Sequence, residues 1–295
     1  MIYTVTVNPS LDYAMEVDKL ILGRTNRSKN EQISFGGKGI NVSAILTALG
    51  VDNIALGFVA GFTGEALERA VCQSGIRCDF IRLREGMTRI NVKLKGQTET
   101  EINASGPSIY PEALEVFLSK LDRLGEGDTL VLAGSLPPSL PRDLYRQILA
   151  RLSSRGIRFV VDATGEMLLS TLPYRPFLIK PNRHELEEIV GSPLSDDCAI
   201  AHAARTLQAK GAQNVLVSLG GDGAILLDEF GMIHRAYAVG GPAVNTVGAG
   251  DSMVAGFLVG SAVDYDYALR LGTAAGGATA QSMELATKEE ILALL

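Results

Sequence analysis

The sequence predicts an α/β fold in which helices cover both faces of a mostly parallel sheet, with a small second sheet beside it. From residue 54 onward, short apolar segments of strand length alternate with longer segments of helical periodicity. This alternation is typical of parallel sheets buried between helices. Four other segments alternate apolar with polar residues, which indicates strands with one solvent-exposed face.

The core strands are expected where β-branched and aliphatic residues cluster. The first occupies residues 2–7 and ends at the turn signal Asn8-Pro9-Ser10. The later strands are expected at residues 54–59, 129–133, 158–161, 177–179 and 214–219, with an edge hairpin at residues 224–227 and 233–239. Helices are expected at residues 64–74, 111–121, 142–154 and 197–210, and a helix rich in small residues at residues 265–283.

The second sheet is expected to combine strands from two distant parts of the sequence and to form a lid over the site. Its strands are expected at residues 13–22, 29–35, 89–95 and 98–103. The predicted core therefore comprises residues 1–11, 36–87 and 104–295, and the predicted lid comprises residues 12–35 and 88–103. Because an isolated four-stranded sheet exposes its edges and an apolar face, we expect a homodimer that forms through the lid.

Composition narrows the class of protein. The chain has 295 residues, 46% of them hydrophobic and 20% charged, which is ordinary for a soluble enzyme. A net charge of −6 argues against a nucleic-acid partner. The three cysteines show no close pairing in the sequence, which fits a reducing compartment without a disulfide framework. With neither a signal peptide nor an apolar span long enough for a bilayer, we expect a cytoplasmic protein with no membrane partner.

A glycine motif, Asn245-Thr246-Val247-Gly248-Ala249-Gly250-Asp251-Ser252, directly precedes an apolar segment that is expected to be a buried helix. Free N–H groups at a helix start bind anions, and the two glycines allow the backbone to approach a ligand closely. A carboxylate at Asp251 beside such a site suits phosphoryl transfer, because it can accept the proton of the attacking hydroxyl. The local residues are equally compatible with a carboxylate that only caps the helix.

A second glycine motif, Gly36-Gly37-Lys38-Gly39-Ile40-Asn41-Val42, leads into a predicted helix that ends at Gly50. It predicts an anion or sugar site, but its spacing is not that of a Walker A loop. Polar residues also follow the carboxyl ends of several predicted core strands, where ligands bind in open α/β sheets. These are Asp12, Ser135, Asp162, Lys180, Asn182, Glu185, Ser218 and Gly220.

The two glycine motifs, in this order and with this strand pattern between them, resemble those of the ribokinase-like (PfkB) carbohydrate kinases. The resemblance extends from Asn8 to about Gln281 and implies a three-layer αβα core with a β lid. Within that family, residues 8–12, 88–93, 134–137 and 180–183 are most similar to kinases of phosphorylated ketohexoses, the 1-phosphofructokinases, with the tagatose-6-phosphate kinases as near neighbours.

The resemblance implies transfer of a phosphoryl group from ATP, with Mg²⁺, to a sugar phosphate. The expected acceptor is the 6-hydroxyl of fructose 1-phosphate, and the alternatives are the 1-hydroxyl of tagatose 6-phosphate, or fructose 6-phosphate. Asp251 would be the catalytic base, and backbone N–H groups after Gly248, at Ala249, Gly250 and Asp251, would form the anion hole.

The resemblance also implies two sets of binding residues. The expected substrate-binding residues are Asp12, Gly37 and Asn41 for sugar hydroxyls, Lys38, Arg89 and Ser135 for the phosphate of the substrate, and Arg27 across a dimer interface. The expected nucleotide-binding residues are Lys180, Asn182, Glu185, Ser218, Gly220, Gly223, Gly277 and Gln281. Asn182 and Glu185 would position Mg²⁺ through water, so no direct metal ligand is expected.

The sequence disfavours two other classes of function. A dinucleotide-dependent oxidoreductase would need a glycine where Met253 follows Gly248-Ala249-Gly250. A non-catalytic sugar-phosphate sensor on the same fold would be expected to lack the base, whereas Asp251 is present.

Overall fold

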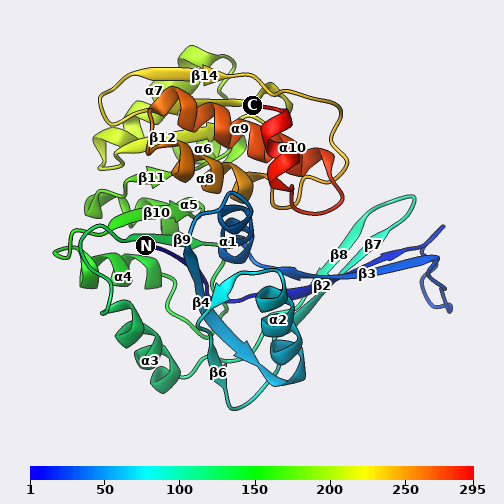
Figure 1. Ribbon diagram of the computed structural model, residues 1–295. Coiled ribbons are helices and arrows are strands. Elements are labelled where there is room, and N and C mark those ends of the chain that lie inside the picture. The colour runs from blue at the N-terminus through cyan, green and yellow to red at the C-terminus, as the bar shows by residue number, and fades with distance from the viewer.

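A ten-stranded sheet forms the centre of the molecule in the computed structural model, which describes residues 1–295 (Figure 1). The strand order is β14-β13-β12-β11-β10-β9-β1-β4-β5, and β6 also pairs with β4. All pairs are parallel except those that join β12, β13 and β14, so the predicted edge hairpin and mostly parallel sheet are confirmed. The strands are β1 (Ile2–Thr6), β4 (Asn53–Ala60), β5 (Arg77–Cys78), β6 (Ile81–Leu83), β9 (Thr129–Ala133), β10 (Arg158–Asp162), β11 (Leu178–Ile179), β12 (Asn214–Ser218), β13 (Ala224–Leu227) and β14 (Ile233–Ala236).

Helices cover both faces of this sheet because the side chains of each strand alternate between two hydrophobic cores. Leu130 and Leu132 of β9 belong to one core, whereas Val131 and Ala133 belong to the other. The first core includes helices α3 (Pro111–Leu121), α4 (Leu144–Leu152), α5 (Gly165–Leu169), α6 (Arg183–Val190) and α7 (Asp197–Ala209). The opposite face carries α1 (Lys38–Ala48), α2 (Gly61–Gln73), α8 (Ala249–Gly260), α9 (Tyr265–Gln281) and α10 (Lys288–Ala293). None of the helices is both long and apolar enough to cross a bilayer.

Helices α8 and α9 lie unusually close because small residues face each other along their contact. A Cβ atom at Gly256 would lie 2.6 Å from the carbonyl oxygen of Leu271, and one at Gly260 would lie 2.5 Å from the Cα of Ala268. On α9, a Cβ at Gly276 would lie 3.0 Å from the carbonyl oxygen of Ala249. Larger side chains would push the helices apart, so this pairing fixes the start of α8 relative to α9.

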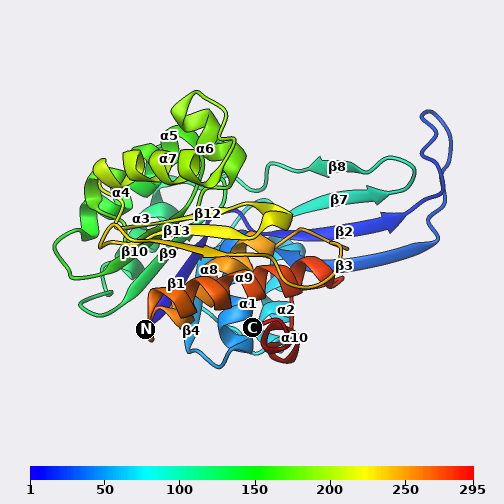
Figure 2. The same cartoon turned by 90° about the horizontal axis from the view of Figure 1, so that it is seen from above.

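The lid is a separate four-stranded sheet with the order β3-β2-β7-β8. It extends away from the core, and the loop between β2 and β3 lies at its far end (Figure 2). The outer pairs of strands are antiparallel and the central pair, β2 with β7, is parallel. The strands are β2 (Ser10–Glu16), β3 (Asn30–Gly36), β7 (Arg89–Lys95) and β8 (Thr100–Asn103).

The expectation that the first lid strand continues to residue 22 was wrong. Strand β2 ends at Glu16, and residues 17–29 form a loop. The Asn26 side chain accepts a hydrogen bond from the Ile21 N–H and donates to the Ile21 carbonyl, and Gly23 adopts a φ of +74°. These local bonds satisfy the backbone of the tip without a strand partner.

The predicted edge strand at residues 233–239 also proved shorter, because β14 ends at Ala236 and the chain then leaves the sheet. Gln281 of α9 holds this departing segment: its Oε1 accepts from the Gly241 N–H (2.9 Å) and its Nε2 donates to the Val239 carbonyl (3.1 Å). The short elements β5, β6, α5 and α10 were not predicted.

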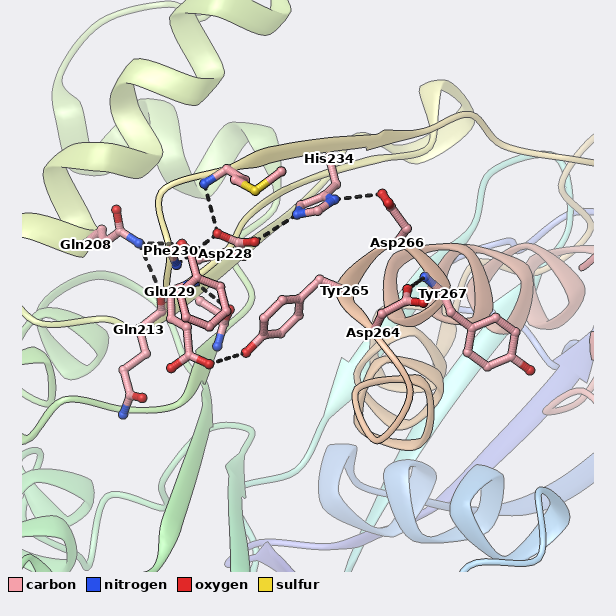
Figure 3. A network of polar contacts seen from close by, with 12 residues as sticks. Gln208, Gln213, Asp228, Glu229, Phe230, His234, Asp264, Tyr265, Asp266 and Tyr267 are labelled. Atoms are coloured by element: carbon pink, nitrogen blue, oxygen red, sulfur yellow. Dashed lines mark hydrogen bonds and ion pairs between the residues drawn. The ribbon is translucent and has the colours of Figure 1, made fainter.

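A histidine between two carboxylates joins the edge hairpin to the start of α9 (Figure 3). The Nε2 of His234 lies 3.0 Å from Asp228 Oδ2, and its Nδ1 lies 2.7 Å from Asp266 Oδ1. Burial opposes the charged form, but the hydrogen bonds to both carboxylates raise the pKa of His234 above its ordinary value. The imidazole therefore ties β14 to α9 on the side away from the lid.

Candidate active site

A cleft of about 1590 Å³ lies where the lid meets the core. Its walls are the end of β1, the cleft-facing side of β2 and β7, the first turns of α1 and α8, and residues 283–289. The core side of the cleft thus combines the carboxyl end of a strand with the amino ends of helices, the two places where a parallel α/β fold presents polar backbone groups to a ligand. The structure therefore brings both glycine motifs into one cleft.

The amino end of α8 presents backbone donors that the protein leaves free. Gly248 adopts a left-handed φ of +82°, which turns the chain into the helix. The N–H groups of Gly250 and Asp251 donate to no group of the protein, whereas that of Ala249 donates to the Thr246 carbonyl at 3.3 Å. A Cβ at Gly250 would lie 3.1 Å from Lys180 Nζ, so an ammonium group flanks these donors. Free N–H groups beside a cation form an anion site.

Asp251 lies in the first turn of α8 and is 5% exposed. Its Oδ2 accepts a hydrogen bond from Asn41 Nδ2 of α1 at 2.8 Å. Burial, and then the charge of Asp162, raise the pKa of Asp251 to about 7, against the opposing effect of Lys38, Asn41 and Lys180. A carboxylate with a pKa near neutrality has the basicity that suits a general base at neutral pH.

Asp162, at the end of β10, is 2% exposed and lies between two lysines. Its oxygens lie 3.1 Å from Lys38 Nζ and 3.6 Å from Lys180 Nζ. Burial acts to raise the pKa of Asp162, but the charges of Lys180 and Lys38 outweigh it and lower the pKa. The carboxylate therefore stays ionised and holds two ammonium groups next to Asp251. The sequence placed Asp162 at a strand end but gave it no role, because its partners are distant in the chain.

Asp12 anchors a polar cluster on the lid side of the cleft. Its Oδ2 pairs with Lys93 Nζ at 3.0 Å, and its Oδ1 accepts from Asn91 Nδ2 at 3.0 Å and from Ser10 Oγ at 2.7 Å. Asn91 and Lys93 belong to the segment 88–93 that carries the family resemblance, but they were assigned no role from the sequence. Their spacing from Arg89 was the available signal, since residues 89, 91 and 93 share one face of a strand.

Arg89 is half-buried in the same cleft and makes no ion pair. Its Nε donates to the Asn8 carbonyl at 3.1 Å and its Nη1 to the Ala104 carbonyl at 3.5 Å. Burial lowers the pKa of Arg89, and the charge of Asp12 acts in the opposite direction. A guanidinium with no carboxylate partner retains donors for an anionic ligand.

Of the remaining predicted substrate-binding residues, three line the cleft and one, Arg27, does not. Gly37, with a φ of +129°, begins α1 inside the cleft, and a Cβ there would lie 2.5 Å from Thr6 Cγ2. Ser135 also lines the cleft and is exposed. Lys38 lines it too, with its ammonium at Asp162. Arg27 lies in the exposed loop at the far tip of the lid and does not line this cleft.

The predicted nucleotide residues lie outside this cleft, at the ends of β11 and β12 and on α9. Asn182 caps α6 and forms a reciprocal capping box with Glu185, in which each side chain accepts from the backbone of the other at 2.8 Å. Asn182 also pairs with Ser218 at the end of β12. Gly220, with a φ of +58°, faces open space, whereas a Cβ at Gly223 would lie 2.2 Å from the Ala236 carbonyl oxygen.

On α9, Gln281 Nε2 donates to the Gly277 carbonyl as well as to Val239. These two residues therefore line the side of α9 that holds the segment after β14. Nowhere do three side chains of the His, Cys, Asp or Glu type converge to hold a metal ion.

Comparison with known proteins identifies the class. The model of the pfkB family carbohydrate kinases matches residues 6–292, and the chain belongs to this family. It is therefore a carbohydrate kinase, and the predicted αβα core with a separate lid sheet is confirmed.

Three known proteins show which members of the family the chain is similar to. The chain is 45% identical to 1-phosphofructokinase of Bacillus subtilis over 100% of this chain and 97% of the relative. It is 38% identical to D-tagatose-1-phosphate kinase of Bacillus licheniformis over 97% and 94% of the two chains. Among solved structures, phosphofructokinase-2 of Escherichia coli in complex with substrates and products aligns with a TM-score of 0.93 at 27% identity, covering 99% and 97% of the two chains.

Proposed function

We propose that this kinase transfers the γ-phosphoryl group of ATP to the 6-hydroxyl of fructose 1-phosphate, forming fructose 1,6-bisphosphate. The observation that carries the proposal is the position of Asp251. It is a buried carboxylate whose pKa is raised to about 7, next to unused helix N–H groups and in one cleft with the unpaired Arg89. The 45% identity to a 1-phosphofructokinase over the full chain supports the choice of substrate.

The reaction begins with the sugar hydroxyl against Asp251. As the oxygen attacks phosphorus, its proton passes to a carboxylate oxygen of Asp251, while Asn41 holds the other oxygen. The transferring phosphoryl group lies against the N–H groups of Gly250 and Asp251. The N–H of Ala249 becomes a third donor to this group when its long hydrogen bond to the Thr246 carbonyl opens. Gly248 provides the left-handed turn that exposes these donors.

Lys180 and Lys38 supply positive charge to the phosphoryl oxygens. Asp162 keeps both ammonium groups in place before the substrates arrive, so their reorganisation costs little during transfer. Lys38 thereby contributes to the transfer region as well as to the substrate phosphate that the family resemblance assigns to it.

The sugar phosphate lies between the lid and the core. Asp12, Gly37 and Asn41 contact its hydroxyls, and Arg89 binds the phosphate with parallel hydrogen bonds, together with Ser135. Lys93 adds a second cation on the same face of the lid. Arg27 is too far along the lid to reach its own cleft, so it would serve the cleft of a second copy.

ATP would occupy the surface beside this cleft. The residues that we assign to it are Lys180, Asn182, Glu185, Ser218, Gly220, Gly223, Gly277 and Gln281. A Mg²⁺ ion would be held by phosphate oxygens and water, with Asn182 and Glu185 contacting it through water; Glu185 Oε1 makes no hydrogen bond within the protein and is free for such a contact. When bound, the ion neutralises negative charge on the phosphates.

Other ketohexose phosphates are alternatives to fructose 1-phosphate as the preferred substrate. Tagatose 6-phosphate and fructose 6-phosphate also carry a phosphate at one end and a primary hydroxyl at the other, and a relative of the chain is a D-tagatose-1-phosphate kinase. The test is kcat/KM measured for fructose 1-phosphate, fructose 6-phosphate, tagatose 1-phosphate and tagatose 6-phosphate under equal conditions. A higher kcat/KM for any of the other three would refute the assignment.

A further inference from the structure

Two cysteines that the sequence left unpaired lie side by side on the outer edge of the core. Cys72 belongs to the last turn of α2 and Cys78 to the edge strand β5, and their Sγ atoms are 2.9 Å apart. The chain reverses between them at Gly75, which adopts a φ of +83°. All three cysteines are free thiols, but α2 turns back here to reach the edge of the sheet, and the turn brings the thiols of Cys72 and Cys78 together.

The two thiols are not equivalent. Cys72 is exposed, whereas Cys78 is partly buried against its neighbour β4, where it pairs with Ala55. Burial, and then the hydrogen bond to Cys72, raise the pKa of Cys78 to about 12. Either sulfur can donate the hydrogen bond between them. Cys72 is the sulfur that a small molecule can reach, because it is exposed and lines a surface pocket, so Cys72 is the attacking group.

A surface pocket of about 390 Å³ surrounds Cys72. Its other lining residues are Glu65, Glu68, Arg69 and Arg82. Arg82 is paired with Glu68, Nη2 to Oε2 at 2.9 Å, whereas Arg69 and Glu65 make no ion pair. The pocket gives a small molecule access to the sulfur, and Arg69 offers a charge to a carboxylate on that molecule.

We propose that Cys72 and Cys78 form a site of reversible oxidation that is served by acidic low-molecular-weight disulfides of the glutathione type. The Cys72 thiolate attacks one sulfur of the small disulfide, the S–S bond of that molecule breaks, and one small thiolate leaves with the protein in a mixed disulfide. Cys78 then gives up its proton and attacks the Cys72 sulfur, which releases the second small thiolate. One S–S bond forms for each that breaks, so two protein thiols are oxidised as one small disulfide is reduced to two thiols.

The pairing has a chemical consequence for an exposed cysteine. A thiolate in solvent is open to oxidation to the irreversible sulfinic and sulfonic acids, whereas a disulfide is restored by thiols. A disulfide with Cys78 therefore keeps the oxidation of Cys72 reversible. The bond would also tie the end of α2 to β5, a strand of only two residues.

The sequence makes the product easy to identify. Trypsin cleavage after Arg69, Arg77 and Arg82 places Cys72 in a peptide of residues 70–77 and Cys78 in a peptide of residues 78–82. The reduced full chain is incubated with glutathione disulfide, alkylated, digested and analysed by mass spectrometry. We expect these two peptides to be linked to each other, and reduction with dithiothreitol to separate them. Glutathione retained on Cys72 with Cys78 free, or no reaction at either cysteine, would overturn the proposal.

Cys198 serves as an internal control, because it is exposed on α7 and has no thiol partner. It should remain alkylatable, or carry glutathione, without entering any protein disulfide. Cys78→Ser should trap glutathione on Cys72, and Cys72→Ser should slow the modification of Cys78 at least tenfold. Equal reaction of Cys78 in the wild type and in Cys72→Ser would contradict the assigned order of attack. Cys198→Ser should leave the link between the two peptides unchanged.

Discussion

Asp251 depends on residues from distant parts of the chain for the properties that a base requires. Asn41 orients its carboxylate from α1, while burial, and then the charge of Asp162 at the end of β10, raise its pKa. The helix in which it lies leaves its own N–H free for the transferring group. A carboxylate that only capped α8 would accept hydrogen bonds from those N–H groups, and Asp251 accepts none.

Replacing Asp251 with Asn keeps the shape of the side chain and removes the base. Asp251→Asn is expected to lower kcat by about 10²–10⁴-fold, since this is the usual contribution of general base catalysis, with little change in the KM values. Steady-state kinetics with both substrates measure this effect. Asp143→Asn is the matched control and should retain wild-type activity, because the half-buried carboxylate of Asp143 pairs with Arg146 outside the cleft. Phosphoryl transfer by Asp251→Asn within tenfold of the wild type would mean that another group is the base.

The raised pKa of Asp251 predicts loss of activity in acid. The base works only as a carboxylate, so kcat/KM should level off above its pKa of about 7 and decrease about tenfold per pH unit below it. A profile of kcat/KM between pH 5.5 and 8.5 checks this. A profile that stayed flat through pH 7 would contradict the assignment.

The raised pKa of Asp251 also predicts that this group favours the folded state in acid more than at high pH. The folded-state pKa of Asp251 lies above its ordinary value of 3.8, so between about pH 4 and 7 the folded chain binds a proton that the unfolded chain has lost. The contribution of this group to stability is therefore present in acid and lost as pH rises through 7. Thermal unfolding should show Asp251→Asn gaining stability over the wild type at pH 8 and not at pH 5.

Arg89 is the cation best suited to the substrate phosphate, because no carboxylate competes for it. Loss of a charged hydrogen-bond donor costs about 2 kcal/mol, so Arg89→Ala should raise the KM for the sugar phosphate roughly 30-fold and that for ATP much less. Arg84→Ala, an exposed arginine of the core, is the control. Equal increases in both KM values would place Arg89 outside the sugar-phosphate site.

A candidate site residue can be predicted from the sequence when the residues that it interacts with lie close to it in the chain. Asp251 and the glycines around it form one continuous motif, so their pattern is visible in a single chain. Asp162 acquires its character only from Lys38 and Lys180, and Lys38 lies 124 residues away. Asn91 and Lys93 are an intermediate case. Strand periodicity alone predicts that they share one face with Arg89, although it does not predict what they bind.

At the level of elements, apolar strands and amphipathic helices were predicted because their periodicity is local. Strands β9 and β13 and helix α3 have the predicted bounds. The lid tip was mispredicted because apolar residues continue after Glu16, whereas side-chain bonds from Asn26 close the loop. Elements as short as β5 and β6 carry too few residues to show a period.

The lid is expected to close when the sugar phosphate binds. Gln32 of β3 already donates to Glu284 near the carboxyl end of the chain at 2.8 Å, and Asp12, Asn91 and Lys93 would add contacts through the ligand. Limited trypsin digestion measures closure, because the lid loop contains exposed basic sites at Arg24 and Arg27.

Fructose 1-phosphate should slow cleavage in this loop without changing cleavage in the core. Arg89→Ala should remove the protection at the same ligand concentration. Protection of the loop that does not depend on the sugar phosphate would argue against closure.

For the whole molecule, the outer face of the lid predicts a homodimer. Strand register aligns Ile33, Tyr13, Val92 and Ile102 in one row across all four strands. Ile33 is 65% exposed and Ile102 is 59% exposed, so this apolar row is open to solvent in a single chain. Light scattering should give a dimer for the wild type and a monomer for the combined Ile33→Glu and Ile102→Glu variant.

Val263→Glu is the matched control, because Val263 is 71% exposed in the turn between α8 and α9 and far from the lid. It should leave the dimer intact. A dimer that persisted in the lid variant would move the interface elsewhere. If Arg27 completes the cleft of the second copy, the monomeric variant should also lose affinity for the sugar phosphate.

The close contact between α8 and α9 has a consequence for how this enzyme can change over evolution. The glycines at that contact leave no room for α8 to shift, so the carboxylate and the anion site form a fixed unit. Asp12 and Arg89, two of the residues assigned to the sugar phosphate, are carried instead by strands of the lid, which extends from the core (Figure 2). Substitutions in the lid can therefore redirect the enzyme to another phosphosugar while the chemistry is inherited intact.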